Sequence, residues 1–149
     1  MVQKAIEMKQ SRQKKQAILI IEHDESRLST LQNILSIGGY RNLICASNQE
    51  QVFKLIRPFQ GRTDDIGMIF LNHDLPQSDT LKFSQLLTTL DGHDAIPLIL
   101  LADKATTIDD ALMAQCHEAN AATIIHYPND GSNLIPLVEL AFALKSERD

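Results

Sequence analysis

Five short aliphatic runs, each followed by a segment with helical spacing, constrain the fold of this 149-residue chain more than any other feature. The runs are apolar on both faces rather than alternating, which is typical of parallel strands buried between two layers of helices. The predicted strands are Ala17–Ile21, Leu43–Ala46, Met68–Leu71, Pro97–Leu101 and Ala122–Ile125. This order predicts one α/β domain in which five strand–helix units form a doubly wound parallel sheet.

The segments between these runs contain residues that commonly begin or end helices. We expect the first helix to end at Gly38 and Gly39, because glycine favours the turn that closes a helix. We expect Ser47, in a capping box with Glu50, to cap the second helix, and Asp79 and Thr107 to cap the third and fourth. The last helix is expected to begin at about Ser132 or Asn133.

Charge and composition narrow the class of protein. The formal net charge is −5, so the chain lacks the overall basic character that nucleic-acid binding usually requires. Basic residues gather in residues 1–16, which we interpret as a flexible extension ahead of a domain at 17–147. Cys45 and Cys116 do not have the spacing of a disulfide framework or a zinc site. No apolar run is long enough to cross a bilayer, and we expect a cytoplasmic protein that binds neither membrane nor nucleic acid.

Ligand and catalytic sites in such folds form where the strands end, at the carboxyl edge of the sheet. The polar and special residues that follow the predicted strands there are Glu22, His23, Asp24, Asn72, Asp74, Ala102 and Tyr127. They include no glycine-rich phosphate loop and no serine in a nucleophile elbow. We therefore expect no catalytic residues and no enzymatic activity.

At these strand ends the chain resembles the receiver domain of bacterial response regulators. Glu22-His23 stands where that family has an acidic pair, and Asn72 stands where it has the aspartate that accepts a phosphoryl group. Leu75-Pro76 follows Asn72 at the family's spacing, Ala102 replaces a Thr or Ser, and Tyr127-Pro128 replaces Lys-Pro. The resemblance implies a flavodoxin-like (βα)5 fold with strand order 2-1-3-4-5. It also implies a signalling module of a two-component or phosphorelay system.

The departures from the family pattern point to a receiver that is not phosphorylated, a pseudo-receiver. Asn72 has no carboxylate with which to form an acyl phosphate. His23 weakens a magnesium site, because Mg²⁺ prefers hard oxygen ligands; Glu22 and Asp74 are weak candidates to bind it, and we expect no cofactor. Tyr127 carries no charge, and we expect its phenol to form a neutral hydrogen-bonded pair with Asn72. If the alignment shifts by one residue, His23-Asp24 becomes the acidic pair.

Two alternatives remain open from the sequence. A working receiver could use an unusual acceptor such as Asp74, and a small α/β protein could bind a ligand or a metal through His23 and His73.

The last predicted helix is apolar around more of its circumference than docking onto a sheet requires. The resulting interface candidates are Leu140, Phe142 and Leu144, and the expected partner is a kinase, an output domain or a second copy of the chain.

Overall fold

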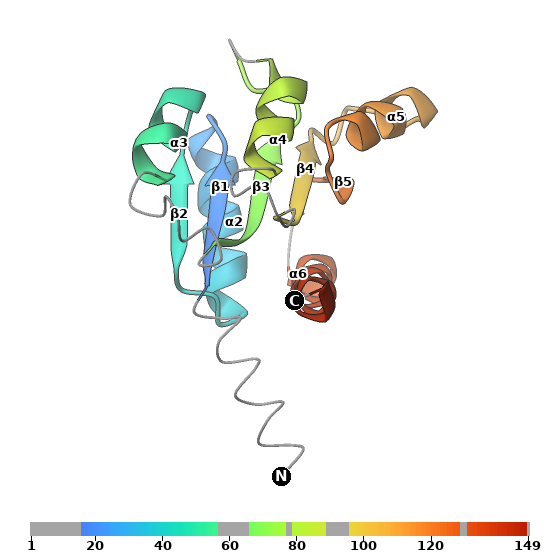
Figure 1. The fold of residues 1–149 in the computed structure, drawn as a ribbon. Coiled ribbons are helices and arrows are strands. Elements are labelled where there is room, and N and C mark those ends of the chain that lie inside the picture. Colours follow the sequence, from blue (N-terminus) through green and yellow to red (C-terminus); the bar gives the residue numbers. More distant parts are fainter. Residues whose placement is uncertain (1–15, 57–65, 77–78, 89–95, 129–130, 149) are drawn as a thin grey trace.

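A five-stranded parallel sheet forms the centre of the protein, as the computed structural model in Figure 1 shows. The structure describes residues 16–56, 66–76, 79–88, 96–128 and 131–148, so the predicted extension at 1–16 lies almost wholly outside the described residues. The strands are β1 (Ala17–Ile21), β2 (Leu43–Ala46), β3 (Ile66–Asn72), β4 (Leu98–Ala102) and β5 (Thr123–His126). They lie in the order β2-β1-β3-β4-β5, which confirms the predicted doubly wound topology.

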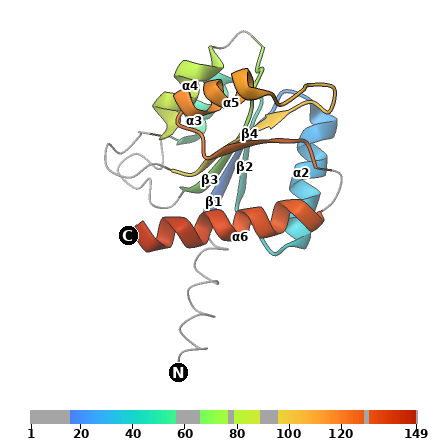
Figure 2. The same ribbon diagram turned by 90° about the vertical axis from the view of Figure 1, so that its right-hand side faces the viewer.

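Helices cover both faces of this sheet. The helices are α2 (Glu25–Ile37), α3 (Gln49–Ile56), α4 (Thr80–Thr88), α5 (Asp110–Glu118) and α6 (Gly131–Arg148). Figure 2 shows α6 across the sheet from α4 and α5. The buried residues divide accordingly, since α2 and α6 pack on one face while α3, α4 and α5 pack on the other.

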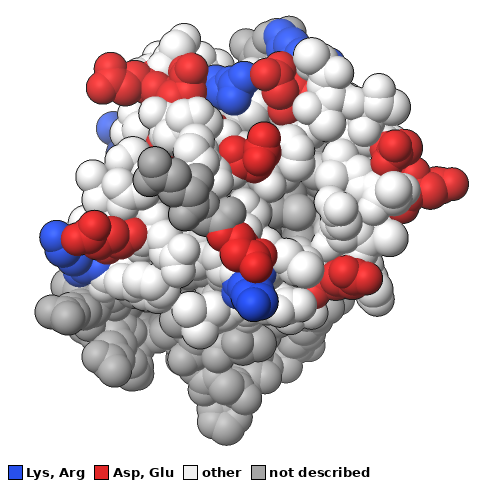
Figure 3. Space-filling view, turned by 90° about the horizontal axis from the view of Figure 1, so that it is seen from above, with Lys and Arg blue, Asp and Glu red and all other residues white. Residues whose placement is uncertain are grey.

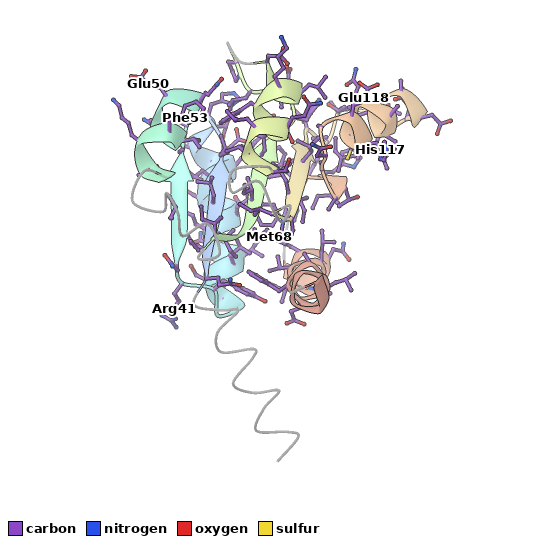
Figure 4. The ribbon with its side chains drawn as sticks, in the orientation of Figure 1. Arg41, Glu50, Phe53, Met68, His117 and Glu118 are labelled. Carbon is purple, nitrogen blue, oxygen red and sulfur yellow. The ribbon has the colours of Figure 1, made fainter. Side chains whose placement is uncertain are left out.

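The strands supply both halves of the core because successive side chains point to opposite faces. In β1, Ile18 and Ile20 face α2 and α6, whereas Leu19 and Ile21 face the three other helices. Met68 of β3, labelled in Figure 4, belongs to the α2 and α6 side. Every residue of β1, β3 and β4 is buried, which explains why these strands read as continuous apolar runs.

Helix ends follow the expected chemistry, but two of the expected caps were wrong. Asn48, not Ser47, caps α3, because its Oδ1 accepts the backbone N–H of Gln51 at 2.9 Å. Ser47 lies one residue earlier and donates its own N–H and hydroxyl to the side-chain oxygen of Gln51. Asp109, not Thr107, caps α5 through the backbone N–H of Leu112.

Two other predicted ends are confirmed, and α6 begins at Gly131, one residue before the predicted Ser132. Asp79 caps α4 through the Lys82 N–H at 3.2 Å. Gly38 ends α2, and Gly39 follows with a φ of 96°, a backbone conformation that favours glycine.

Phe142 is a core residue, so its prediction as an interface residue was wrong. It is 1% exposed and stacks on Tyr40 with ring centroids 5.9 Å apart. Its ring occupies the space beside Gly67 of β3 where any larger residue would place a Cβ. Because Gly67 has no side chain, α6 can approach the backbone of β3 closely, and Phe142 is buried where the two meet.

The two other interface candidates have different outcomes. Leu140 is 56% exposed on α6, and the side chain of Leu144 lies outside the described residues. Among the described helices, none is long and apolar enough to span a membrane.

Candidate functional site

A buried carboxylate, Glu22, lies at the carboxyl end of β1 and organises the residues around it. Glu22 is only 1% exposed. The side-chain amide of Asn72, at the end of the adjacent strand β3, donates to both of its oxygens, at 3.1 and 3.2 Å. The backbone N–H of Asp24 donates to Glu22 Oε1 at 2.9 Å. These donors satisfy a group that would be costly to bury alone.

The neighbours of this pair complete a small polar cluster. His23 is half-exposed, and its Nδ1 lies 3.1 Å from Glu22 Oε1 and 3.4 Å from Asn72 Nδ2. The other end of the Asn72 amide, Oδ1, accepts the backbone N–H of Asp74 at 2.9 Å. Because both ends of the amide are engaged, Asn72 holds the loop after β3 against the end of β1. The structure thus brings Glu22, His23 and Asn72 together, as predicted.

Asp24 and Asp74 are not ligands within this cluster. The Asp24 carboxylate caps α2 by accepting the N–H of Arg27, and this bond holds the pKa of Asp24 below its usual value. The Asp74 side chain is exposed, and only its backbone reaches the cluster. His73 lies apart as well, with its Nδ1 3.2 Å from the backbone oxygen of Leu101.

The donor set of the cluster does not fit a magnesium ion. Mg²⁺ needs oxygen ligands in near-octahedral geometry, but both oxygens of Glu22 and the oxygen of Asn72 face N–H donors. His23 offers nitrogen, which magnesium binds poorly. No group of three or more His, Cys, Asp or Glu side chains is arranged to hold a metal within the described part of the chain.

The expected hydrogen-bonded pair of Tyr127 and Asn72 was wrong. Tyr127 is buried after β5, and its hydroxyl has no hydrogen-bond partner among the described residues. Its ring instead lies beneath the guanidinium of Arg27, 4.8 Å from ring centroid to Arg27 Cζ. Arg27 also donates from Nη2 to Asp103 Oδ2 at 2.7 Å. Three strand-end segments therefore meet at Arg27, which sequence reasoning did not single out.

Asp103 begins the loop after β4 and fixes its first turn. Its Oδ1 accepts the Ala105 N–H at 3.2 Å, and its backbone oxygen accepts the Thr106 N–H at 2.9 Å. The bond from the Ala105 N–H, with the nearby Arg27 guanidinium, holds the pKa of Asp103 below its usual value. Ala102, the residue before it, is fully buried and has no polar side-chain atom to offer the site.

Comparison with known proteins bears on the fold. No protein-family profile and no curated protein sequence matches the chain. Among solved structures, a response-regulator receiver domain from Clostridium thermocellum is similar, with a TM-score of 0.72, 16% identity, and coverage of 90% of this chain and 99% of that one. The signal receiver domain of an HD domain-containing protein from Pseudomonas fluorescens is similar over 91% and 93%, at 23% identity and a TM-score of 0.71. The chain has the receiver-domain fold.

A third similar structure is a pilus assembly-related protein from Burkholderia pseudomallei, with a TM-score of 0.69, 17% identity, and coverage of 92% and 96%. The identities are low, so the likeness concerns architecture rather than particular side chains.

The carboxyl edge of this receiver fold is more acidic than basic, as the view from above in Figure 3 shows. Exposed acidic side chains around the strand ends include Asp74, Asp79, Asp103, Asp109 and Asp110. The described part of this face therefore lacks the continuous basic surface that contacts with nucleic-acid phosphates require.

One sequence signal could have identified Arg27. It lies in the first turn of α2, where the helix dipole favours anions over cations. A cation at such a position needs compensation, and the structure supplies it through Asp103 and the ring of Tyr127.

Proposed function

We propose that this protein is a receiver-like signalling module that works without phosphorylation of its own chain and acts through contacts with other proteins. The observation that carries the proposal is the side-chain amide of Asn72. It stands at the position of the family's phosphoacceptor, and its N–H group donates to the buried carboxylate of Glu22. An amide cannot form an acyl phosphate, so Asn72 accepts no phosphoryl group, and we further propose that the module is not an enzyme.

The Asn72 amide also makes a metal unnecessary for the stability of the cluster. Two carboxylates at this distance would repel each other and would need a cation between them. An amide supplies a neutral donor in place of the second carboxylate, which leaves Glu22 satisfied. We therefore propose that the protein binds Mg²⁺ weakly at most, and that its resting arrangement is independent of magnesium.

The direct test is incubation with acetyl phosphate and Mg²⁺, followed by intact-mass and peptide mass spectrometry. We expect no phosphoryl adduct labile to hydroxylamine on the wild-type protein. A receiver domain with an intact aspartate acceptor, treated in parallel, is the positive control that shows whether the assay can detect an adduct. A hydroxylamine-labile adduct on the wild type would contradict the proposal.

The alternative of a working receiver with Asp74 as acceptor makes a different prediction. The Asp74 side chain is exposed and is not among the groups that contact Glu22, so nothing in the cluster supports it as a nucleophile. If the wild type nevertheless gains an adduct that Asp74→Asn abolishes, this alternative replaces our proposal.

We propose the exposed part of α6 around Leu140 as the contact surface. Leu140 is 56% exposed, and exposed leucine on a helix that packs its other side on the sheet favours a protein partner. A second copy of the chain, a kinase and an output domain are the candidate partners.

Sedimentation velocity over a range of concentrations tests the second copy. Leu140→Ser should dissociate a dimer, whereas Ile37→Ser should not, although Ile37 on α2 is 87% exposed. A wild type that remains monomeric at the highest concentration excludes self-association and leaves a different protein as the partner.

A further inference from the structure

An ion pair joins the start of α2 to the loop after β4. Arg27 donates from Nη2 to Asp103 Oδ2 at 2.7 Å, across 76 positions of the chain. The same guanidinium lies over the ring of Tyr127, with Cζ 4.8 Å from the ring centroid. Arg27 therefore contacts both the first residue of the loop and the buried ring that follows β5.

We propose that this ion pair is a latch. It holds residues 103–105 in a closed position beside Tyr127, and when it opens, this segment takes a second position in which the Tyr127 hydroxyl reaches water. The proposal goes beyond the function proposed above and does not depend on it, because it involves neither Glu22 nor Asn72.

Opposing contributions of similar size act on the closed position. The Tyr127 hydroxyl is buried and has no hydrogen-bond partner among the described residues. This destabilises the closed position, because the hydroxyl has lost its contact with water. The ion pair, whose side chains are 31% and 52% exposed, and the contact of the guanidinium with the ring act in the other direction. Exposed ion pairs and exposed cation–π contacts each contribute little, so the second position lies close to the closed one in free energy.

The structure also gives this segment room to move. A cavity of about 200 Å³ lies between the start of α2 and the loops after β4 and β5, and Arg27, Asp103 and Tyr127 line it. All three residues of the segment are exposed. At its far end, His126 Nε2 lies 2.7 Å from the backbone oxygen of Thr106, which ties that residue to β5. The movement is therefore confined to the short segment between the end of β4 and Thr106.

Release of the latch changes the surface at the carboxyl edge of the sheet. When Arg27 leaves the Tyr127 ring, the face of the ring that the guanidinium covers becomes accessible together with the hydroxyl. The protein thus has two surfaces at this edge, and the state of the ion pair determines which of them a partner meets.

The test is solvent-exchange NMR of the ¹⁵N-labelled protein, with 3-fluorotyrosine as a second label, because the chain contains only two tyrosines. In the closed position the N–H groups of Ala105 and Thr106 donate to Asp103, at 3.2 and 2.9 Å. Arg27→Gln removes the charge and keeps a good helix former. It should speed exchange at both amides about tenfold and move the fluorine signal of Tyr127 toward that of free fluorotyrosine. Unchanged exchange in Arg27→Gln would overturn the proposal.

A second substitution tests whether the buried hydroxyl drives the release. In the double variant Arg27→Gln with Tyr127→Phe, no hydroxyl gains water when the segment moves. Exchange at Ala105 and Thr106 should therefore return to within about twofold of the wild type. Exchange as fast as in Arg27→Gln alone would show that the hydroxyl does not drive the movement, and the proposal would be wrong.

A control variant and a change of salt complete the test. Lys54→Gln breaks an exposed ion pair within α3, with Glu50 at 3.5 Å, and should leave the exchange at Ala105 and Thr106 unchanged. NaCl at about 1 M screens exposed charges, so it should speed exchange at the same two amides of the wild type while the amides of β1 and β3 stay protected. This measurement needs no substitution, so it tests the latch even if Arg27→Gln does not fold. Equal exchange at low and high salt would contradict the proposal.

Discussion

Replacing Asn72 by aspartate tests whether its amide is what allows Glu22 to be buried. The Asn72 nitrogen lies 3.1 and 3.2 Å from the two oxygens of Glu22, which is 1% exposed. In Asn72→Asp an acceptor oxygen replaces this donor, and two carboxylates then share an enclosed site. Either both stay ionised, or one takes up a proton.

The cheaper of these two routes sets the expected loss of stability. Two unit charges about 4 Å apart repel by about 4 kcal/mol at an effective dielectric constant of about 20, and the lost hydrogen bond to a charged group adds about 1.5–3 kcal/mol. A protonated aspartic acid can instead donate its O–H to Glu22. Holding a group with an unfolded pKa of about 3.9 protonated at pH 7 costs about 4 kcal/mol. Protonation is the cheaper route, so we expect a loss of about 4 kcal/mol at pH 7.

The pH dependence follows from the raised pKa of the introduced carboxyl group. The folded variant retains a proton that the unfolded chain releases above a pH of about 4, so its stability falls as the pH rises through that window. The deficit relative to the wild type should therefore shrink from about 4 kcal/mol at pH 7 to about 1.5 kcal/mol at pH 5. Urea unfolding of both proteins at the two pH values measures this change.

Two further variants control the interpretation. Asn33→Asp makes the same substitution on an exposed position of α2 and should change the free energy of unfolding by less than about 0.5 kcal/mol. The double variant Glu22→Gln with Asn72→Asp exchanges the amide and the carboxylate, and it should recover about 2 kcal/mol of the loss. A deficit in Asn72→Asp below about 1 kcal/mol that is equal at both pH values would refute the reasoning.

Two other substitutions test packing that the structure makes explicit. Tyr127→Phe removes a buried hydroxyl that has no partner among the described residues. The free energy of unfolding, measured in urea, should therefore rise by about 1 kcal/mol. A fall of that size would mean that the hydroxyl is hydrogen-bonded in solution. Gly67→Ala places a methyl group where the Phe142 ring lies, and it should cost about 2 kcal/mol or more. An unchanged thermal midpoint for Gly67→Ala would show that α6 does not rest on β3 at this point.

The topology could be predicted from sequence because the information is local and redundant. β1 and β4 are continuous aliphatic runs, and complete burial on both faces is the reason for that pattern. β3 extended beyond its predicted bounds because Gly67 and Asn72 interrupt the apolar pattern without leaving the strand.

Helix caps were less predictable because several candidates stand side by side. Ser47 and Asn48 are both good caps by residue type, and so are Thr107 and Asp109. Which of them bonds the first turn depends on where the preceding loop leaves the sheet, and that is a tertiary property. The resulting errors were of one and two residues.

Phe142 shows a different limit of sequence reasoning. α6 is apolar on most sides, so periodicity alone could not separate Phe142, in the core, from Leu140, at the surface. Phe142 is buried because Gly67, 75 positions earlier in the chain, has no side chain and leaves room for its ring. A glycine inside a strand is a known sign of close approach by another element, but it does not say which element approaches.

Some contacts in the candidate site could be predicted from the sequence, and others could not. The residues at the strand ends could be located from spacing, since parallel strands end at one edge, and the pairing of Asn72 with Glu22 follows from the adjacency of β1 and β3. Tyr127 was expected to join them as the partner of Asn72. It packs instead under Arg27, a residue from α2 that is also bonded to the loop after β4. The strand ends therefore divide into two neighbouring groups, a satisfied buried carboxylate and a cation beside a cavity. In the first, the Asn72 amide joins the buried carboxylate of Glu22 to the loop after β3 through hydrogen bonds at both of its ends.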